Sequence, residues 1–274
     1  MSCFNPTIQC PCDRSVGETG FCYDEPPAGE TLFDLKGQVY RRSYWRCGLC
    51  GHEFSEHDID LSGLYDGPYV EHTYGERVRA TFDRILALRP EASDNTGRVR
   101  RVLDFAAKHF PPRHCPSLLD VGAGLGVFPF RMKEAGWECT ALDPAPQVEE
   151  HLSKVVGVRT VSRDFLKLRP EDLGRFDVIT LNKVIEHVAD PVTMLRKVVD
   201  LQTPGGFVYV EVPDVAAAVE GPGREEYFIE HHHVFSPASL ANTAARSGLE
   251  MLSMQRLREP SGKYTIVMFA CVPQ

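Results

Sequence analysis

The stretch Ser117–Asp143 constrains the fold of this chain more than any other. Its sequence, SLLDVGAGLGVFPFRMKEAGWECTALD, predicts a strand, a glycine-rich turn, a helix and a second strand that ends in a carboxylate. In a parallel sheet, this pattern places a ligand crevice beyond the carboxyl ends of the strands. Gly122, Gly124 and Gly126 would let the backbone approach a ligand closely. Asp143 lies where a carboxylate can accept hydrogen bonds from both hydroxyls of a ribose.

The spacing of the glycines separates two classes of nucleoside ligand. The dinucleotide fingerprint needs glycine at its first, third and sixth positions, and here the sixth position is Val127. Asp120, two residues before the first glycine, would also repel a pyrophosphate. A cationic cofactor without phosphate fits better, and S-adenosylmethionine is one, with a sulfonium, an ammonium and a ribose diol. An oxidoreductase is therefore disfavoured.

The composition of the whole chain limits its partners. Its 274 residues suit one substantial domain plus an appendage, and 43% hydrophobic residues can build a core. A formal net charge of −8 argues against nucleic acid as the main partner, because phosphate binding needs a basic face. No apolar run approaches the roughly 20 residues that span a bilayer, and no signal peptide opens the chain. We expect a cytoplasmic protein that binds neither nucleic acid nor a membrane, with its oligomeric state open.

Six of the nine cysteines lie before residue 51, which in a reducing compartment suggests metal in place of disulfides. Cys47-Gly-Leu-Cys50-Gly has the form of a zinc knuckle, and Cys10-Pro-Cys12 is a second half whose spacing is one residue short. Cys22 or His52 are substitute ligands, and free cysteines in a loop-rich subdomain are the alternative. A segment this small cannot be stabilised by an apolar core alone, so a structural Zn²⁺ is physically sensible. The four expected ligands are Cys10, Cys12, Cys47 and Cys50.

From Ser117 onward, predicted strands and helices alternate, which favours an α/β doubly wound sheet. Asp190 is expected to cap a helix, Thr203–Gly206 to form a turn, and Thr96 to cap an upstream helix that ends near residue 110. The last two strands are joined by so few residues that they must be antiparallel. The strands predicted after the glycine-turn unit are 158–161, 176–181, 207–212, 249–257 and 264–272.

This order, with its antiparallel last strand, resembles that of the class I S-adenosylmethionine-dependent methyltransferases. The resemblance covers about residues 96–272 and rests on D-x-G-x-G-x-G, the acid that ends the second strand, L-N-K-V-I-E-H-V-A-D-P and T-P-G-G. It implies a Rossmann-like sheet and S-adenosylmethionine as cofactor. The cofactor-binding residues that it implies are Asp120, Gly122, Gly124, Gly126, Asp143, Asp164, Phe165 and Asn182.

The resemblance implies a different role for each acid in this set. Asp143 would bind the ribose hydroxyls, and Asp164 would accept from the adenine amino group beside the backbone of Phe165. Asn182 lies where the family places backbone contacts to the methionine end, and Asp120 is expected to orient the turn. An N-cap role is the competing interpretation of Asp164.

A catalytic base is expected in the segment Glu230-His231-His232-His233, in the loop after the fifth strand. Alignment does most of the work in methyl transfer from a sulfonium, but a hydroxyl or carbon nucleophile must still lose its proton. In an extended segment, His231 and His233 would share a face. We expect one base or substrate ligand and two structural rings. No second ligand group lies nearby in sequence to support a metal site, and His187 is a second candidate for the base.

A cysteine-rich head followed by this domain resembles the sugar C-methyltransferases and relatives that act on polysaccharide or natural-product sugars. Their loop reads like Y-H-E-H-x-x-Y-F-S, and F-I-E-H-H-H-V-F-S stands in register here, which implies that His231 is the base beside Glu230. Ile229 and Val234 depart from that pattern, and the long C-terminal domain of those enzymes is not present. O-methylation of a sugar or sugar nucleotide is therefore at least as well supported as C-methylation.

We divide the chain into a zinc-ribbon-like segment (1–70), a helical linker or lid (71–115) and a methyltransferase domain (116–274). The aromatic run Tyr65–Tyr74 is expected to form a lid or substrate wall, and packing of the head on the body is its alternative role. The competing function is a zinc-dependent binding module with a catalytically silent Rossmann-like body. The intact glycine turn and Asp143 argue against that loss of activity.

Overall fold

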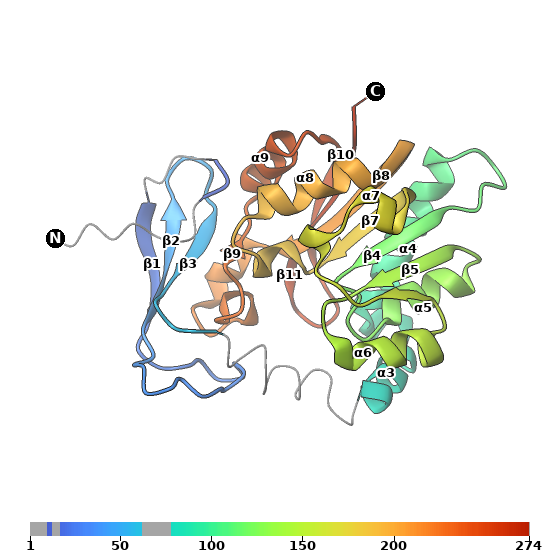
Figure 1. Ribbon diagram of the computed structural model, residues 1–274. Helices are drawn as coiled ribbons and strands as arrows, with labels where there is room; N and C mark the ends of the chain where they lie inside the picture. Colours follow the sequence, from blue (N-terminus) through green and yellow to red (C-terminus); the bar gives the residue numbers. More distant parts are fainter. Residues whose placement is uncertain (1–9, 13–16, 62–77, 274) are drawn as a thin grey trace.

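The computed structural model describes residues 10–12, 17–61 and 78–273. A seven-stranded sheet with helices on both faces forms the larger part, and a four-stranded sheet lies beside it at the N-terminal end (Figure 1). Among the described residues, no helix is both long and apolar enough to cross a bilayer.

The seven-stranded sheet has the order β10-β11-β8-β7-β4-β5-β6. Because β4 pairs in parallel with both β5 and β7, the strand order reverses at β4, which is where open α/β sheets bind ligands. β11 pairs antiparallel with β8 and with β10, so the prediction of antiparallel last strands is confirmed. The bounds are β4 (Ser117–Val121), β5 (Glu138–Leu142), β6 (Arg159–Val161), β7 (Phe176–Asn182), β8 (Gln202–Pro213), β10 (Glu250–Arg258) and β11 (Tyr264–Cys271).

Side chains alternate between the two faces of β8, as the two-residue period of a strand requires. Phe207 and Tyr209 pack with α4 (Asp94–His109) and α5 (Val127–Glu134) on one face. Val208 and Val210 pack on the other face, in the cluster that α8 (Pro191–Leu201) and α9 (Pro237–Arg246) complete. Both faces are therefore covered, and the ligand sites are left to the carboxyl edge of the sheet. The remaining helices are α3 (Val78–Leu86), α6 (Pro146–His151, continued by a π-helical turn at Leu152–Val156) and α7 (Pro170–Leu173).

Helix caps follow the sequence signals at two sites and depart from them at a third. Asp190 and Ser236 accept main-chain N–H bonds at the starts of α8 and α9. The prediction that Thr96 caps α4 is wrong, because the hydroxyl of Ser93 accepts the N–H of Thr96 and the helix begins at Asp94. The predicted turn at 203–206 falls within the bounds of β8, at a break in its pairing: Phe176 pairs with Gln202 and Val178 with Phe207, and Gly205 has a φ of 78°.

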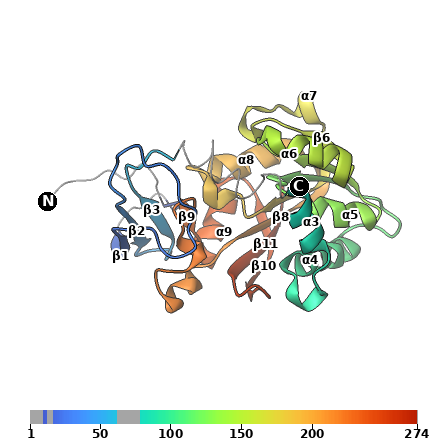
Figure 2. The same cartoon turned by 90° about the horizontal axis from the view of Figure 1, so that it is seen from below.

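The small sheet takes its fourth strand from the other end of the chain. β1 (Gly17–Tyr23), β2 (Arg42–Cys47) and β3 (Glu53–Glu56) form an antiparallel ribbon, and β9 (His233–Val234) pairs with β3 (Figures 1 and 2). The described cysteine-rich part (residues 10–12 and 17–61, here called the head) and the rest of the described chain (78–273, the body) therefore share one sheet.

Buried tyrosines fill the space between this sheet and the body. The rings of Tyr44 and Tyr227 are fully buried and meet edge to face, with centroids 5.1 Å apart. The hydroxyl of Tyr227 donates to Glu53 at 2.6 Å. Head and body thus pack through these residues. The predicted lid, Tyr65–Tyr74, lies outside the described residues and stays a prediction.

Candidate active site

The glycine turn between β4 and α5 contains three left-handed residues. Gly122, Gly124 and Gly126 have φ angles of 69°, 53° and 71°, a region that other residues rarely adopt. A Cβ on Gly122 would lie 2.7 Å from Val184, in the loop after β7. A Cβ on Gly126 would lie 2.6 Å from Leu152, in the turn that continues α6. Packing of the protein itself therefore requires two of these glycines, whereas their approach to a cofactor stays a prediction.

Asp143 follows β5 and holds the glycine turn. Its carboxylate oxygens accept the main-chain N–H groups of Gly124 (2.8 Å) and Ala145 (2.9 Å). The side chain is 5% exposed, and burial raises its pKa. It lines a cavity of about 650 Å³, and each oxygen keeps a further lone pair. The carboxylate is thus fixed in place and still able to accept ribose hydroxyls.

Asp164 and Phe165 line the same cavity. Asp164 accepts the N–H of Leu166 at 3.0 Å and so caps a short 3₁₀ turn, as the competing interpretation holds. Its second oxygen lies 3.4 Å from Lys167, and the side chain is nearly half exposed. Phe165 is buried and gives the cavity an apolar wall. The cavity therefore combines an apolar side with two acids, a suitable environment for a nucleoside.

Asp120 lies at the end of β4, where it connects two strands. Its Oδ1 accepts the hydroxyl of Thr180 (2.6 Å) and the side-chain amide of Asn182 (2.8 Å), both on β7. Burial raises the pKa of Asp120 to about 7, although these bonds and Arg98 oppose the shift. Asp120 and Asn182 therefore brace the turn, and both line a cavity with the three glycines.

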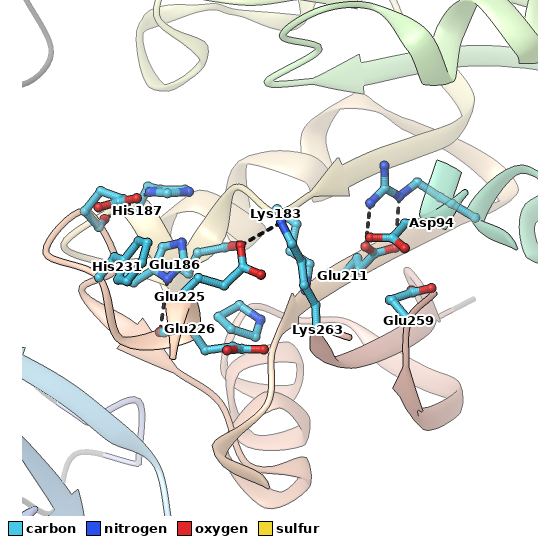
Figure 3. A pocket seen from close by; sticks show the side chains of 14 residues that line it. Asp94, Lys183, Glu186, His187, Glu211, Glu225, Glu226, His231, Glu259 and Lys263 are labelled. Carbon is cyan, nitrogen blue, oxygen red and sulfur yellow. Dashed lines mark hydrogen bonds and ion pairs between the residues drawn. The ribbon is translucent and has the colours of Figure 1, made fainter. Parts of the chain in front are cut away.

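A third cavity, of about 280 Å³, lies next to the Asp143 cavity, because Lys183 and His187 line both (Figure 3). The three predicted catalytic residues, His187, Glu230 and His231, all line it. They come from the loops after β7 and before β9, which the structure brings together. The sequence separates these loops by more than forty residues.

The rings of His187 and His231 are in edge-to-face contact at the wall of this cavity. Their ring centroids lie 4.8 Å apart, and each Nδ1 lies 3.0 Å from a main-chain carbonyl, that of Glu230 for His187 and that of Glu226 for His231. Because a carbonyl can only accept, Nδ1 carries the proton and Nε2 keeps its lone pair. Burial lowers the pKa of His187 to about 4 and that of His231 well below its usual range. Both rings are therefore neutral bases at pH 7.

Glu186 also lines this cavity, although the sequence did not single it out. It is fully buried, and neither carboxylate oxygen meets a hydrogen-bond partner within the described part of the chain. One of its oxygens lies within 4.8 Å of a ring nitrogen of both His187 and His231. Burial raises the pKa of Glu186, and that of Glu230, to about 7. The only feature of the sequence that pointed to Glu186 is its position directly before the candidate base His187.

A buried ion pair closes the cavity on the side of α4. Arg98 donates two hydrogen bonds to Glu211 on β8, at 2.9 and 2.5 Å, and Glu211 is fully buried. Arg98 holds the pKa of Glu211 far below its usual value, against the effect of burial. The lone acid in the apolar run of β8 was the sequence signal for this pair.

The remaining two histidines of the triplet lie outside this cavity. The expectation that His233 shares a face with His231 is wrong, because the chain bends at His232 and β9 begins only at His233. His233 is fully buried, and its Nδ1 lies 2.9 Å from Nε2 of His52 in the head. The N–H of His232 donates to the carbonyl of Glu186 at 2.8 Å. These two residues hold the loop in place.

The four predicted zinc ligands lie together. Sγ of Cys10 lies 3.2 Å from that of Cys12 and 3.3 Å from that of Cys50, and Sγ of Cys12 lies 3.5 Å from that of Cys47. All four sulfurs lie within 4.8 Å of one another, as the thiolates of one tetrahedral ion would. The substitutes are placed elsewhere: Cys22 is exposed, and His52 bonds to residues of the body.

Comparisons with known proteins extend these findings. A ubiquinone biosynthesis O-methyltransferase of Bordetella avium (strain 197N) is 29% identical over 156 residues, which cover 50% of this chain and 64% of that protein. Another, of Xanthomonas euvesicatoria pv. vesicatoria (strain 85-10), is 31% identical over 156 residues, or 49% of this chain and 62% of that protein. The chain thus spans less than two thirds of the length of these curated relatives.

Two solved structures share the fold. The 1,6-didemethyltoxoflavin-N1-methyltransferase of Burkholderia thailandensis, with 1,6-didemethyltoxoflavin and S-adenosylhomocysteine bound, has a TM-score of 0.55 at 20% identity and covers 81% of this chain and 96% of its own. The magnesium protoporphyrin IX methyltransferase of Synechocystis PCC 6803, with S-adenosylhomocysteine bound, has a TM-score of 0.55 at 12% identity, with coverage of 74% and 97%. These identities show the fold alone.

The family is shown by sequence. A family model described as a methyltransferase domain matches residues 71–254, which is more than half of the chain. The glycine turn, Asp143 and the antiparallel last strands fall within or directly beside that range. The chain belongs to the methyltransferase-domain family and has the Rossmann-like fold of the class I S-adenosylmethionine-dependent methyltransferases.

Proposed function

We propose that this protein transfers the methyl group of S-adenosylmethionine to an oxygen or carbon of a small sugar-like acceptor. One observation carries the proposal: the cavity that contains Asp143 meets the cavity that contains His231 at the shared residues Lys183 and His187. A cofactor in the first and an acceptor in the second would place donor and nucleophile on either side of one boundary.

The residues of the first cavity are suited to the cofactor in the following way. Asp143 accepts the two ribose hydroxyls with its remaining lone pairs, and Asp164 accepts from the adenine amino group beside Phe165. Gly122 lines this cavity and also the cavity at the glycine turn, which Gly124 lines, and the backbone of both residues would allow close approach. When bound, S-adenosylmethionine would supply a methyl group on a sulfonium, whose C–S bond would break as the new bond to the acceptor forms, so that the sulfur leaves as the neutral thioether S-adenosylhomocysteine.

The second cavity supplies the proton acceptor. As the acceptor oxygen attacks the methyl carbon, its proton passes to Nε2 of His231, whose Nδ1–H is held by a main-chain carbonyl. His187 lies beside it as a second base, and Glu186 and Glu230 offset the positive charge that forms on the ring. A carbon nucleophile would lose its proton to the same atom.

We also propose that Cys10, Cys12, Cys47 and Cys50 hold a structural Zn²⁺. Three of these residues are buried, and their sulfurs converge from the two ends of the N-terminal segment. Four thiolates form a closed tetrahedral site without a position for substrate, so the ion would contribute to folding and take no part in the chemistry.

Transfer of an isotopically labelled methyl group from S-adenosylmethionine to a panel of hydroxylated acceptors tests the proposed activity. The variant His231→Ala should lower kcat by about 100- to 10,000-fold, and the surface variant His114→Ala should leave it unchanged. Full turnover by His231→Ala would remove His231 as the base. Failure of the wild-type protein to methylate any acceptor would contradict the proposal.

A further inference from the structure

The cavity beside His231 also indicates what kind of acceptor it binds. Of the described residues that line it, seven are carboxylic acids and three are cations, a formal excess of four negative charges. Most of the acids have partners: Arg98 binds Glu211, and Lys263 lies 2.9 Å from Glu225. The net negative charge of the cavity therefore disfavours an anionic ligand. The polar atoms without hydrogen-bond partners indicate which ligand is favoured.

Above pH 7, where Glu186 and Glu230 are mainly ionised, the unpaired polar atoms of this cavity are hydrogen-bond acceptors. Within the described chain, no partner meets either carboxylate oxygen of Glu186 or Oε2 of Glu230, and these side chains are 0% and 8% exposed. The lone pairs at Nε2 of His187 and His231 add two more acceptors, since Nδ1 of each ring carries the proton. A buried acceptor left without a donor costs about 1–3 kcal/mol, more if charged, so a ligand that supplies donors is favoured.

The cations of the cavity already bind protein atoms. Arg98 donates to Glu211, Lys263 to Glu225, and Lys183 donates to the hydroxyl of Thr265 at 2.8 Å. A phosphate entering here would meet the carboxylates of Glu186 and Glu230, and Arg98 and Lys263 are already paired with acids. An alkyl chain would leave both carboxylates without donors. Neither ligand suits the cavity.

We infer that the acceptor group that enters this cavity is a polyhydroxylated ring without phosphate or another anionic group, whose hydroxyls donate to Glu186 and Glu230. The inference rests on the proposed methyl transfer and narrows the range of acceptors. The sequence allowed a sugar or a sugar nucleotide, and the cavity favours a free or glycosidically linked sugar unit. The cavity volume of about 280 Å³ admits roughly one such ring. One hydroxyl then lies next to His231 for methylation.

Ligand-observed NMR of the full-length protein saturated with S-adenosylhomocysteine tests this inference. The probes are methyl glycosides of glucose, galactose, mannose and rhamnose, the matching sugar 1-phosphates, and a long-chain alkyl phenol. Binding of at least one glycoside, at least about 100-fold tighter than its 1-phosphate, is the expected result, because juxtaposed like charges cost several kcal/mol. A phosphate or the phenol binding more tightly, or no glycoside binding at all, would overturn it.

A variant of Glu186 tests whether its negative charge, and not the size of its side chain, determines the ligand preference. Glu186→Gln should reduce the preference for glycoside over phosphate at least about 10-fold, because it removes one buried charge. The matched control is Glu138→Gln, which removes an exposed carboxylate at the start of β5, away from the residues that line this cavity. An unchanged preference in Glu186→Gln would contradict the inference. S-adenosylhomocysteine binding is measured first: its absence would count against the proposed function, whereas its presence without glycoside binding would count against this inference alone.

Discussion

The hydroxyl of Tyr44, in the cysteine-rich head, donates a hydrogen bond to the main-chain carbonyl of His231 at 2.5 Å. Tyr44 is fully buried on β2, and its hydroxyl also lies 3.3 Å from the carbonyl of Phe228. On β3, the strand between β2 and β9, Ser55 donates its N–H to the carbonyl of His232 at 2.9 Å. The head therefore sets the position of the loop that carries the proposed base.

Removing that hydroxyl should affect catalysis more than cofactor binding. Tyr44→Phe leaves a buried carbonyl with one donor fewer and frees the loop, so we expect kcat to fall about 10- to 100-fold. The affinity for S-adenosylhomocysteine should not change, because the residues of its proposed site belong to the body. Tyr23→Phe is the control, since this buried tyrosine of the head donates its hydroxyl to the main-chain carbonyl of Pro222 and not to that of His231. Equal losses of kcat in both variants would show that the head acts only through stability.

Loss of metal from the head should have the same selective effect. Cys47→Ser removes one proposed thiolate, and the carbonyl of Cys50 next to it accepts the hydroxyl of Ser236, which caps α9. We expect zinc content measured by mass spectrometry to fall and turnover to fall with it, at unchanged S-adenosylhomocysteine affinity. Cys22→Ser, which changes an exposed cysteine outside the cluster, should keep both. Substoichiometric zinc in the wild-type protein would contradict the metal site.

Two glycines in left-handed conformations should differ in their tolerance of a methyl group. Gly126→Ala adds both backbone strain and a contact at 2.6 Å with Leu152, so we expect about 2–4 kcal/mol of lost stability. At Gly136, also at positive φ, a Cβ meets no atom of the described chain within 4 Å, so Gly136→Ala should cost only about 1 kcal/mol. Chemical denaturation measures both. Equal costs would show that packing against the π-helical turn is not required.

The buried carboxyl of Glu186 should make stability depend on pH. Its pKa is about 7 in the folded protein and near 4.5 when exposed, so between these values the folded state binds more protons. The free energy of unfolding therefore falls as pH rises through this window. Glu186→Gln removes the effect and should be about 1–3 kcal/mol more stable than wild type at pH 8, with a smaller difference at pH 5.

Glu211→Gln should change the free energy of unfolding in the opposite direction to Glu186→Gln. The pKa of Glu211 is lowered by Arg98, so Glu211→Gln should be less stable than wild type at both pH values, because it leaves a buried arginine unpaired. If Glu186→Gln were less stable than wild type at pH 8, the prediction would be wrong, and another group would have to stabilise the ionised carboxylate of Glu186.

Local patterns in the sequence predicted most of the body. The glycines, Asp143 and the short connection between the last two strands each act over a few residues, and the structure places them as expected. The four cysteines also converge, although they belong to two separate pairs in the sequence.

Relationships between distant segments could not be predicted in this way. The pairing of β3 with β9 joins residues near 54 and 233, and the two-residue strand β9 is too short to show a period. The role of Glu186 depends on the absence of a partner, which is a property of the folded cavity and not of the sequence around it. The expected face shared by His231 and His233 failed for the same reason, because a bend at His232 interrupts the strand.

Calorimetric titration of the purified protein with S-adenosylhomocysteine and, separately, with NAD⁺ tests the central claim most directly. The account predicts that S-adenosylhomocysteine binds at one site per chain, that Asp143→Ala weakens this binding at least about 100-fold through the loss of charge-assisted bonds to the ribose, and that NAD⁺ does not bind. Binding of NAD⁺ in place of S-adenosylhomocysteine, or unchanged affinity in Asp143→Ala, would contradict it.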